Sequence, residues 1–383
     1  MIAAQVIFWC SVILLAHSYF IYPLLVRIIS IGKKQNKNCF SLTGELPEVS
    51  ILLAVFNEEE VMNQKILSTL DSSYPVSKLE FLIGSDASTD DTEEIIRRCS
   101  VQFPQIKYYP FKNRTGKAGI MNHLAARAGG EILLLTDANV MFSRQTIFEL
   151  VKHFKNDSIA LVAGNILNSE VKSDGISKQE STYQAFENNL KYREGVLWGA
   201  MMGASGGCYT VRSEYFSPTP ENFIVDDFYI TIAALEKGGK AICELEASCY
   251  EDVSNLSKEE FRRKSRIATG NFQILRRFWK LLSPGRGEMA FAFFSHKILR
   301  WLGPFFILTA YLSSFVLSFQ HDYYKFFFWI QTILLLTPLI DLVLIKLKIH
   351  LHGLRYISHF YMMNLAMLNG FFKFLRGVKH NVW

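Results

Sequence analysis

A nearly continuous apolar run, Val49-Ser-Ile-Leu-Leu-Ala-Val55, ends at Phe56-Asn57-Glu58. A short apolar stretch bounded by polar residues is typical of a strand that is buried on both faces, as in parallel sheets. The residues that follow, 59–70, have a helical pattern. The sequence therefore predicts a strand over 49–55 and a helix over 59–70, which together begin a βαβ unit.

The same alternation continues along the chain. We expect further strands over 79–84, 106–109 and 131–136, and helices over 92–99 and 117–128. Strands and helices that alternate at this short spacing predict a doubly wound α/β domain, with a parallel sheet and helices on both faces. In such sheets the site lies at the carboxyl ends of the strands.

Acidic and amide side chains follow three of these expected strands. Asn57 and Glu58 follow the first, Asp86 follows the second, and Asp137 and Asn139 follow the fourth. A single carboxylate at such a place could merely cap a helix or shape a turn, but the set favours a binding site. The chain has no GxGxxG or GxxxxGK[ST] motif, which disfavours a dinucleotide dehydrogenase and a P-loop NTPase.

Charge is distributed unevenly over the 383 residues, of which 50% are hydrophobic and 20% charged. A soluble chain usually carries about 25% charged residues. Residues 1–26, 301–320, 326–340 and 356–372 contain no Lys, Arg, Asp or Glu. Because about 20 apolar residues span a bilayer as a helix, the sequence predicts a soluble domain between membrane segments.

We expect five segments, of which the large soluble domain is cytoplasmic. They are an N-terminal transmembrane anchor (1–32), the large domain (47–282), an interfacial helix (283–300), a transmembrane hairpin (301–345) and a last segment (356–375). The last segment could be transmembrane, re-entrant or interfacial, since basic residues flank both its ends. Basic residues follow the first apolar run and flank the hairpin, which predicts a multi-pass protein of the cell (inner or plasma) membrane.

Two alternatives concern the apolar segments. A cleaved signal peptide would begin with basic residues, whereas this chain begins without charge and its basic residues follow the run. Asp341, inside the third apolar run, could mark a functional intramembrane site or pack inside a helix bundle, and we favour packing.

Composition excludes several other classes of protein. The apolar content is too high for a disordered chain. Six cysteines without a CxxC motif indicate reduced thiols and no disulfide scaffold. The net charge of +6 is modest, and much of it lies beside the apolar segments, so lipid headgroups are expected partners and nucleic acid is not.

In order and spacing, six motifs resemble those of family 2 glycosyltransferases of the GT-A fold. The flanking apolar segments resemble those of the membrane-bound, polysaccharide-synthase-like branch. The motifs are Ala54-Val55-Phe56-Asn57-Glu58 (P-x-Y-N-E), Ser85-Asp86-Ala87-Ser88-Thr89-Asp90 (D-D-G-S-T-D), the stretch 115–122 (G-K-x-x-A-L-N), Asp137-Ala138-Asn139 (D-x-D), Gly203-Ala204-Ser205-Gly206-Gly207 (a glycine-rich loop) and Val225-Asp226-Asp227 (E-D).

The resemblance implies transfer of a sugar, with inversion, from a nucleotide-sugar to a lipid-linked or polysaccharide acceptor; it favours a uridine nucleotide. A divalent cation, Mg or Mn, would neutralise the diphosphate. Asp227 would be the general base, with Asp226 beside it, although both could simply begin a helix. The implied roles are catalysis by Asp227, Asp226 and Arg266, donor-nucleotide binding by Phe56, Asn57, Glu58, Asp86, Lys117 and Arg263, and metal binding by Asp137 and Asn139.

Two motifs depart from the family pattern. Asn139 replaces an aspartate, and an amide oxygen can ligate a cation but adds no negative charge. The family's Q-x-x-R-W box reads Arg263-Lys264-Ser265-Arg266-Ile267, which puts a processive reaction in doubt. Arg266 could clamp a diphosphate, or the basic stretch could bind anionic lipid.

These departures motivate a second hypothesis, a nucleotide-sugar-binding membrane scaffold that has lost catalysis. The retained acidic residues and Arg266 argue against it. A membrane channel is less favoured still, since the expected spans offer no polar pore.

Overall fold

The computed structural model describes residues 1–169, 176–252, 256–347, 349 and 351–378. They form two compact units. The sheet unit consists of the described residues within 29–170 and 184–253, and the helical unit of those within 1–28, 171–183 and 254–377.

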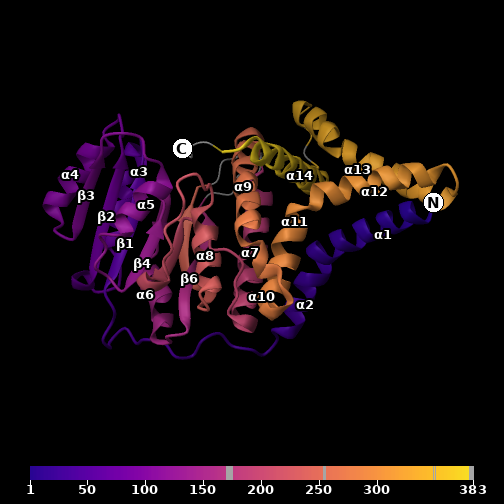
Figure 1. Cartoon of the computed structure of the whole chain (residues 1–383). Coiled ribbons are helices and arrows are strands. Elements are labelled where there is room, and N and C mark those ends of the chain that lie inside the picture. The colour runs from indigo at the N-terminus through magenta and orange to yellow at the C-terminus, as the bar shows by residue number, and fades with distance from the viewer. Residues whose placement is uncertain (170–175, 253–255, 348, 350, 379–383) are drawn as a thin grey trace. The chain divides into compact units, whose positions relative to one another are not determined.

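The sheet unit is built on one eight-stranded sheet with the order β3-β2-β1-β4-β7-β6-β8-β5 (Figure 1). Strands β1 to β4 are parallel, as the sequence predicts. The other half is mixed, because β7 runs antiparallel to β4 and β6, and β5 antiparallel to β8. The strands are β1 (Val49–Val55), β2 (Leu79–Asp86), β3 (Ile106–Phe111), β4 (Ile132–Thr136), β5 (Val140–Phe142), β6 (Ile159–Asn168), β7 (Cys208–Arg212) and β8 (Lys240–Glu251).

Helices lie on both faces of this sheet. They are α3 (Glu59–Leu70), α4 (Thr92–Gln102), α5 (Lys117–Ala125), α6 (Thr146–Val151), residues 184–198 of α7 (Ser177–Trp198), and α8 (Asp226–Glu236), with 3₁₀ turns at Val76–Lys78, Lys152–Lys155 and Ser213–Tyr215. The predicted doubly wound α/β domain is therefore confirmed.

Burial of β1 explains why its sequence is almost uniformly apolar. All of its residues are buried, and those on one face share a core cluster with Met62 of α3, Ile96 of α4 and Leu150 of α6. The other face of β1 points toward α5. On the same face of the neighbouring strand β2, a Cβ on Gly84 would lie 2.4 Å from Ile120 Cγ2 of α5. The register pairs Val55 with Ser85 and Leu53 with Thr136, so β1, β2 and β4 end at one edge of the sheet.

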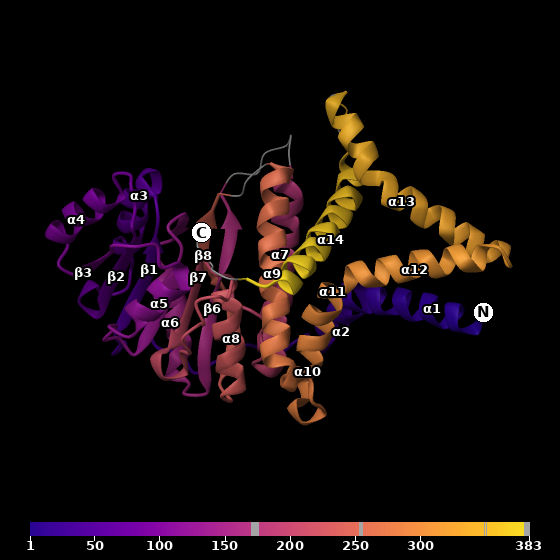
Figure 2. The ribbon, with the colours of Figure 1, turned by 45° about the horizontal axis from the view of Figure 1, so that its top comes forward.

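The helical unit contains the remaining helices, several of them apolar. They are α1 (Ile2–Ala16), α2 (Tyr22–Ile29), α9 (Ser257–Phe278), α10 (Gly287–Ala292), α11 (Leu299–Trp301), α12 (Gly303–Ser318), α13 (Asp322–Lys346) and α14 (His352–Arg376), with π-helical turns at His17–Ile21 and Phe293–Ile298 and 3₁₀ turns at Trp279–Leu282 and Pro284–Arg286. In Figure 2, α1 lies beside α12, and α13 follows α12 as a hairpin.

Within the described part of the chain, two helical stretches are long and apolar enough to cross a membrane, Ile2–Ile29 and Asp322–Lys346. The pair Pro284–Trp301 and Gly303–Ser318, bent by 61°, would provide a third if it forms one span. The large apolar side chains that α13 exposes, such as Ile333 and Leu339, suit contact with lipid. These helices indicate membrane association. Among the described helices α14 is not a candidate span, and the alternatives for 356–375 stay open.

Two further expectations concern Asp341 and the cysteines. Asp341 on α13 is buried, and its Oδ1 lies 4.0 Å from Nε of the equally buried Arg355 on α14. This pairing favours a packed polar residue within the helical unit. All six cysteines lie among the described residues and are free thiols, as the sequence predicts.

A pair of adjacent glycines tests the packing at the start of β4. A Cβ on Gly130 would lie 2.7 Å from the backbone nitrogen of Ser50, whereas a Cβ on Gly129 would meet only Glu80 Oε1 at 3.6 Å. We expect Gly130→Ala to lower the free energy of unfolding by about 1–3 kcal/mol, the usual cost of overpacking. Gly129→Ala should change it by less than about 0.5 kcal/mol. Thermal unfolding of the full chain in detergent measures both, and equal losses would contradict the packing described.

Candidate active site

The predicted site residues of the sheet unit gather where β1, β2 and β4 end. Asn57 and Glu58 follow β1, Asp86 is the last residue of β2, and Asp137 follows β4. Lys117 begins α5. The parallel register of these strands places their carboxyl ends at one edge, which is where ligands bind in α/β sheets.

Lys117 lies among the acidic residues of this edge. Its Nζ is 2.7 Å from Asp137 Oδ1 and 3.8 Å from Asp226 Oδ2. Burial alone would lower the pKa of Lys117, but the two carboxylates outweigh burial and raise it. Lys117 therefore stays charged and draws Asp137, after β4, and Asp226, at the start of α8, toward its ammonium group.

Asp227 is the second residue of α8 and is partly buried. Its Oδ1 accepts a hydrogen bond from the Phe228 backbone N–H at 2.7 Å. Burial, followed by the charge of Asp226, raises the pKa of Asp227 to about 6, although Lys117 and Lys191 oppose the shift. A carboxylate that titrates close to neutral pH can act as a general base.

The glycine-rich loop passes directly over Asp227. A Cβ on Gly206 would lie 3.1 Å from Asp227 Oδ2. Gly203 has φ +87°, and a Cβ there would lie 2.3 Å from the Phe228 ring. Glycine is required at 203 both for its backbone conformation and for this close approach. Lys191 of α7 also supports the loop, because its Nζ lies 3.2 Å from Ser205 Oγ.

Asp86 fixes the loop that precedes α5. Its buried carboxylate accepts hydrogen bonds from the Thr115 backbone N–H at 2.5 Å, the Gly116 N–H at 3.1 Å and Arg114 Nε at 3.1 Å. The Arg114 guanidinium stacks over the Phe56 ring at 3.4 Å. Sequence reasoning missed Arg114, although its place just before the Gly116-Lys117 motif offered a signal.

Asn57 and Glu58 hold the segment after β1 to the segment after β2. Asn57 has φ +53°, a conformation that Asn tolerates, and its Oδ1 accepts a hydrogen bond from the Thr89 N–H at 2.9 Å. The Glu58 backbone N–H donates to Thr92 Oγ1 at 2.8 Å. Burial, then the charges of Asp137 and Asp90, raise the pKa of the Glu58 side chain.

Asp137, Ala138 and Asn139 form a tight turn that the Val140 N–H closes by donating to the Asp137 carbonyl at 3.3 Å. Asn139 Nδ2 donates to Glu251 Oε1 at 3.3 Å. Glu251 reaches the turn because β5 pairs with β8 in a register that sets Val140 against Glu251. Sequence reasoning missed Glu251, since it did not predict β8. The described residues hold no group of three or more His, Cys, Asp or Glu that could bind a metal alone.

Arg263 and Arg266 lie on α9, in the helical unit. Arg263 Nη1 is 3.5 Å from Glu260 Oε2, and the neighbouring Lys264 pairs with Glu180 at 2.9 Å. Their roles toward a donor stay predictions.

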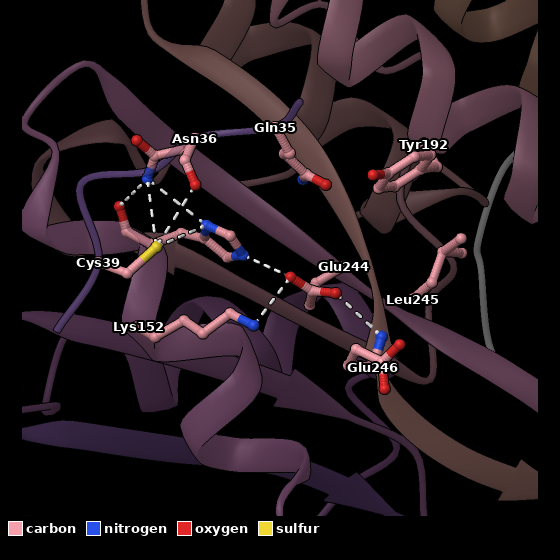
Figure 3. A pocket seen from close by; sticks show the side chains of 9 residues that line it. Gln35, Asn36, Cys39, Lys152, Tyr192, Glu244, Leu245 and Glu246 are labelled. Atoms are coloured by element: carbon pink, nitrogen blue, oxygen red, sulfur yellow. Dashed lines mark hydrogen bonds and ion pairs between the residues drawn. The ribbon is translucent and has the colours of Figure 1, made fainter. Parts of the chain in front are cut away.

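A second polar cluster of the sheet unit lines a pocket of about 340 Å³ (Figure 3). His153 Nε2 lies 2.6 Å and Lys152 Nζ 3.1 Å from Glu244 Oε2, and Cys39 Sγ lies 3.5 Å from His153 Nδ1. Burial would raise the pKa of Glu244, but the hydrogen bond with His153 and the other contacts lower it to about 2. Glu244 lies about 23 Å of strand away from Glu251, at about 3.3 Å per residue. The cluster ties the segment before β1 to the sheet.

Fold and site together define an α/β domain with an anionic, lysine-centred site at the strand ends. Residues 50–217 match the family model described as Glycosyl transferase family 2. The structure is similar to Mannosyltransferase PcManGT from Pyrobaculum calidifontis, solved in complex with GDP-Man and Mn²⁺, with a TM-score of 0.72, 19% identity and coverage of 96% of this chain and 99% of that chain.

Curated relatives agree with this match. Probable glycosyltransferase YdaM of Bacillus subtilis is 24% identical over 245 residues, covering 61% of this chain and 57% of the relative. Beta-monoglucosyldiacylglycerol synthase of Nostoc is 22% identical over 249 residues (64% and 53%). Poly-beta-1,6-N-acetyl-D-glucosamine synthase of Staphylococcus epidermidis is 25% identical over 291 residues (73% and 68%). The chain spans little more than half the length of the first two.

Residues 50–217 therefore form a domain that matches the family 2 glycosyltransferases. The structure has the GT-A fold, as the motifs predict.

The cluster around Glu244 is expected to matter for stability and not for catalysis. Glu244→Gln removes the charge that Lys152 and His153 contact, and should lower the free energy of unfolding by about 1–3 kcal/mol. Glu246→Gln, at an exposed position of the same strand, should change it by less than about 0.5 kcal/mol. Thermal unfolding measures both. A variant at Glu244 that loses transfer activity but keeps its stability would show the opposite role.

Proposed function

We propose that the chain is an inverting glycosyltransferase that moves a sugar from a nucleotide-sugar to a lipid-linked or polysaccharide acceptor at the cytoplasmic face of the membrane. The observation that carries the proposal is the grouping of Lys117, Asp137 and Asp226, with Asp227 next along α8, at the strand ends of a family 2 domain.

The donor nucleotide is proposed to bind between the ends of β1 and β2. Phe56 and Arg114 offer a stacked surface for a base, and Asn57 and Glu58 lie beside it with groups that can accept hydrogen bonds. Asp86 acts by fixing the Arg114–Gly116 segment. A uridine nucleotide is favoured by the motifs; the similar mannosyltransferase was solved with GDP-Man, so both nucleotides belong in a donor screen.

The turn at Asp137 and Asn139 fits a divalent cation, Mg or Mn, that the donor's diphosphate also ligates. Such ions are commonly bound by one or two carboxylates together with substrate phosphates. The hydrogen bond from Asn139 Nδ2 to Glu251 leaves the amide oxygen of Asn139 as the ligand. Bound there, the ion would neutralise charge on the leaving diphosphate.

Asp227 is proposed to take the proton of the attacking acceptor hydroxyl. The acceptor oxygen forms a bond to the anomeric carbon, and the bond from that carbon to the diphosphate oxygen breaks. The electron pair of the broken bond stays on the diphosphate, and this single displacement inverts the anomeric configuration. With a pKa of about 6, Asp227 is ionised at neutral pH yet basic enough to accept a proton. Lys117, and Arg266 with Arg263 from α9, would stabilise the leaving diphosphate.

The proposed sugar acceptor and the proposed orientation in the membrane rest on other observations. Two relatives carry names of enzymes that act on a diacylglycerol lipid and a polysaccharide. The basic residues that flank the candidate spans favour a multi-pass protein whose sheet unit is cytoplasmic.

Replacing the proposed base tests catalysis directly. Asp227→Asn should lower turnover by about 10²–10⁴-fold, while the exposed Asp91→Asn should leave turnover unchanged. The folded-state pKa of Asp227 lies above its ordinary value, so ionised Asp227 makes the folded state less stable above about pH 6. Asp227→Asn removes this ionisation and should therefore not lower the unfolding temperature at pH 7. Wild-type turnover should fall below about pH 6.

Release of nucleoside diphosphate from UDP-sugars and GDP-sugars in membranes measures this turnover. Full activity of Asp227→Asn would refute the assigned base. If the wild-type chain binds these donors but turns over none of them with any acceptor, the alternative of a catalytically impaired nucleotide-sugar-binding scaffold holds instead.

The departure at Asn139 predicts a response to added charge. Asn139→Asp places a second carboxylate at the turn, and should lower the Mn²⁺ concentration that gives half-maximal turnover by about tenfold, which corresponds to about 1.4 kcal/mol. Asn38→Asp, on an exposed segment, controls for the change in net charge. A titration of turnover against Mn²⁺ measures the effect, and an identical titration curve for Asn139→Asp would exclude this turn as the cation site.

A further inference from the structure

A buried lysine lies beneath the turn that carries Asp137 and Asn139. Lys65 of α3 has no exposed surface. Its Nζ donates to Thr136 Oγ1 at 2.8 Å and to the Val140 carbonyl at 2.5 Å, and lies 3.8 Å from the centroid of the Phe142 ring. These contacts are a hydroxyl, a carbonyl and an aromatic face. Burying an ammonium group costs several kcal/mol, and a methionine would fill similar space without that cost.

The two oxygens that Lys65 contacts flank the turn. Thr136 comes immediately before Asp137, and Val140 comes immediately after Asn139. The Thr136 hydroxyl in turn donates to the Gly207 carbonyl at 2.8 Å. One ammonium group therefore links α3 to both ends of the turn and, through Thr136, to the glycine-rich loop.

We propose that Lys65 is a positioning residue, whose ammonium group sets the geometry of the Asp137–Asn139 turn, and through Thr136 that of the glycine-rich loop, for binding of the donor diphosphate. The proposal rests on the function proposed above, since it concerns the same site. Lys65 acts through Thr136 and Val140, because its complete burial keeps it from touching the donor.

The charge state of Lys65 offers a readout that a purely structural lysine would not give. Burial lowers its pKa to about 8, while Cys208, Cys249 and Asp137, which face it from β7, β8 and the turn, raise it in part. The pKa of Cys249 lies well above its ordinary value, and that of Lys117 is raised. Above about pH 8 the ammonium loses its charge, and donor binding should weaken.

Stability should change in the opposite direction over the same pH range. The folded-state pKa of Lys65 lies below its ordinary value of 10.5, so the unfolded chain binds more protons between about pH 8 and 10.5. Stability therefore gains a contribution as pH rises through that window. Weaker donor binding together with unchanged or greater stability would separate positioning from general unfolding.

The experiment compares full-length wild type, Lys65→Met, Thr136→Val and the double variant in detergent. Binding of UDP and of GDP in the presence of Mn²⁺, the KM and kcat for the donor, and the unfolding temperature are measured from pH 7 to 10. We expect Lys65→Met to weaken nucleotide binding and raise the donor KM at least tenfold, without lowering the unfolding temperature. Its binding should also lose the pH dependence near 8. Met62→Leu, at a buried position of the same helix, is the matched control.

The double variant tests the route of the effect. If Lys65 acts through Thr136, the double variant should bind no more weakly than Lys65→Met alone, because the two substitutions remove one linkage. Wild-type affinity in Lys65→Met, a loss explained by a lower unfolding temperature, or additive losses in the double variant would each overturn the proposal. If wild type itself binds neither nucleotide, the proposed function fails along with this proposal; if wild type binds and Lys65→Met binds equally, only this proposal fails.

Discussion

The ion pairs of Lys117 are the interaction on which the rest of the site depends. Asp137 and Asp226 arrive from different parts of the chain and would repel each other without a cation between them. Lys117 begins α5, directly after the loop that Asp86 fixes, so the packing of that loop decides where the cation lies. The strand ends, the start of α8 and the start of α5 are thus coupled through one side chain.

The Asp137–Asn139 turn is held from two sides. Lys117 contacts Asp137 at the strand-end edge of the sheet, and Lys65 contacts the residues that flank the turn from the interior. Glu251 adds a contact to Asn139 from β8. A turn constrained in this way needs little rearrangement when a charged ligand arrives, and electrostatic stabilisation is most effective when the polar groups are oriented in advance.

Local sequence patterns predicted the parallel half of the sheet, the place of the polar residues at the strand ends and the family match of residues 50–217. The apolar run at 49–55 is unambiguous because β1 is buried on both faces. The mixed half escaped prediction, since β7 and β8 take their places through pairings with distant strands. Lys65 follows two polar residues, Asn63 and Gln64, so the sequence suggests an exposed position. Only the tertiary structure shows that Lys65 is buried. Domain boundaries and site roles stay predictions.

The close approach of the glycine-rich loop to α8 has a consequence for redesign. Gly203 allows the loop to touch Phe228, and no side chain fits there; Gly206 brings the loop against Asp227, where a Cβ would make a tight contact of 3.1 Å with Oδ2. Because glycine has no side chain, Gly203 and Gly206 allow the loop to lie close to the start of α8 and the Asp227 carboxylate. Ser205, between them, is partly exposed. An effort to broaden the range of accepted molecules would therefore vary Ser205 and leave both glycines unchanged.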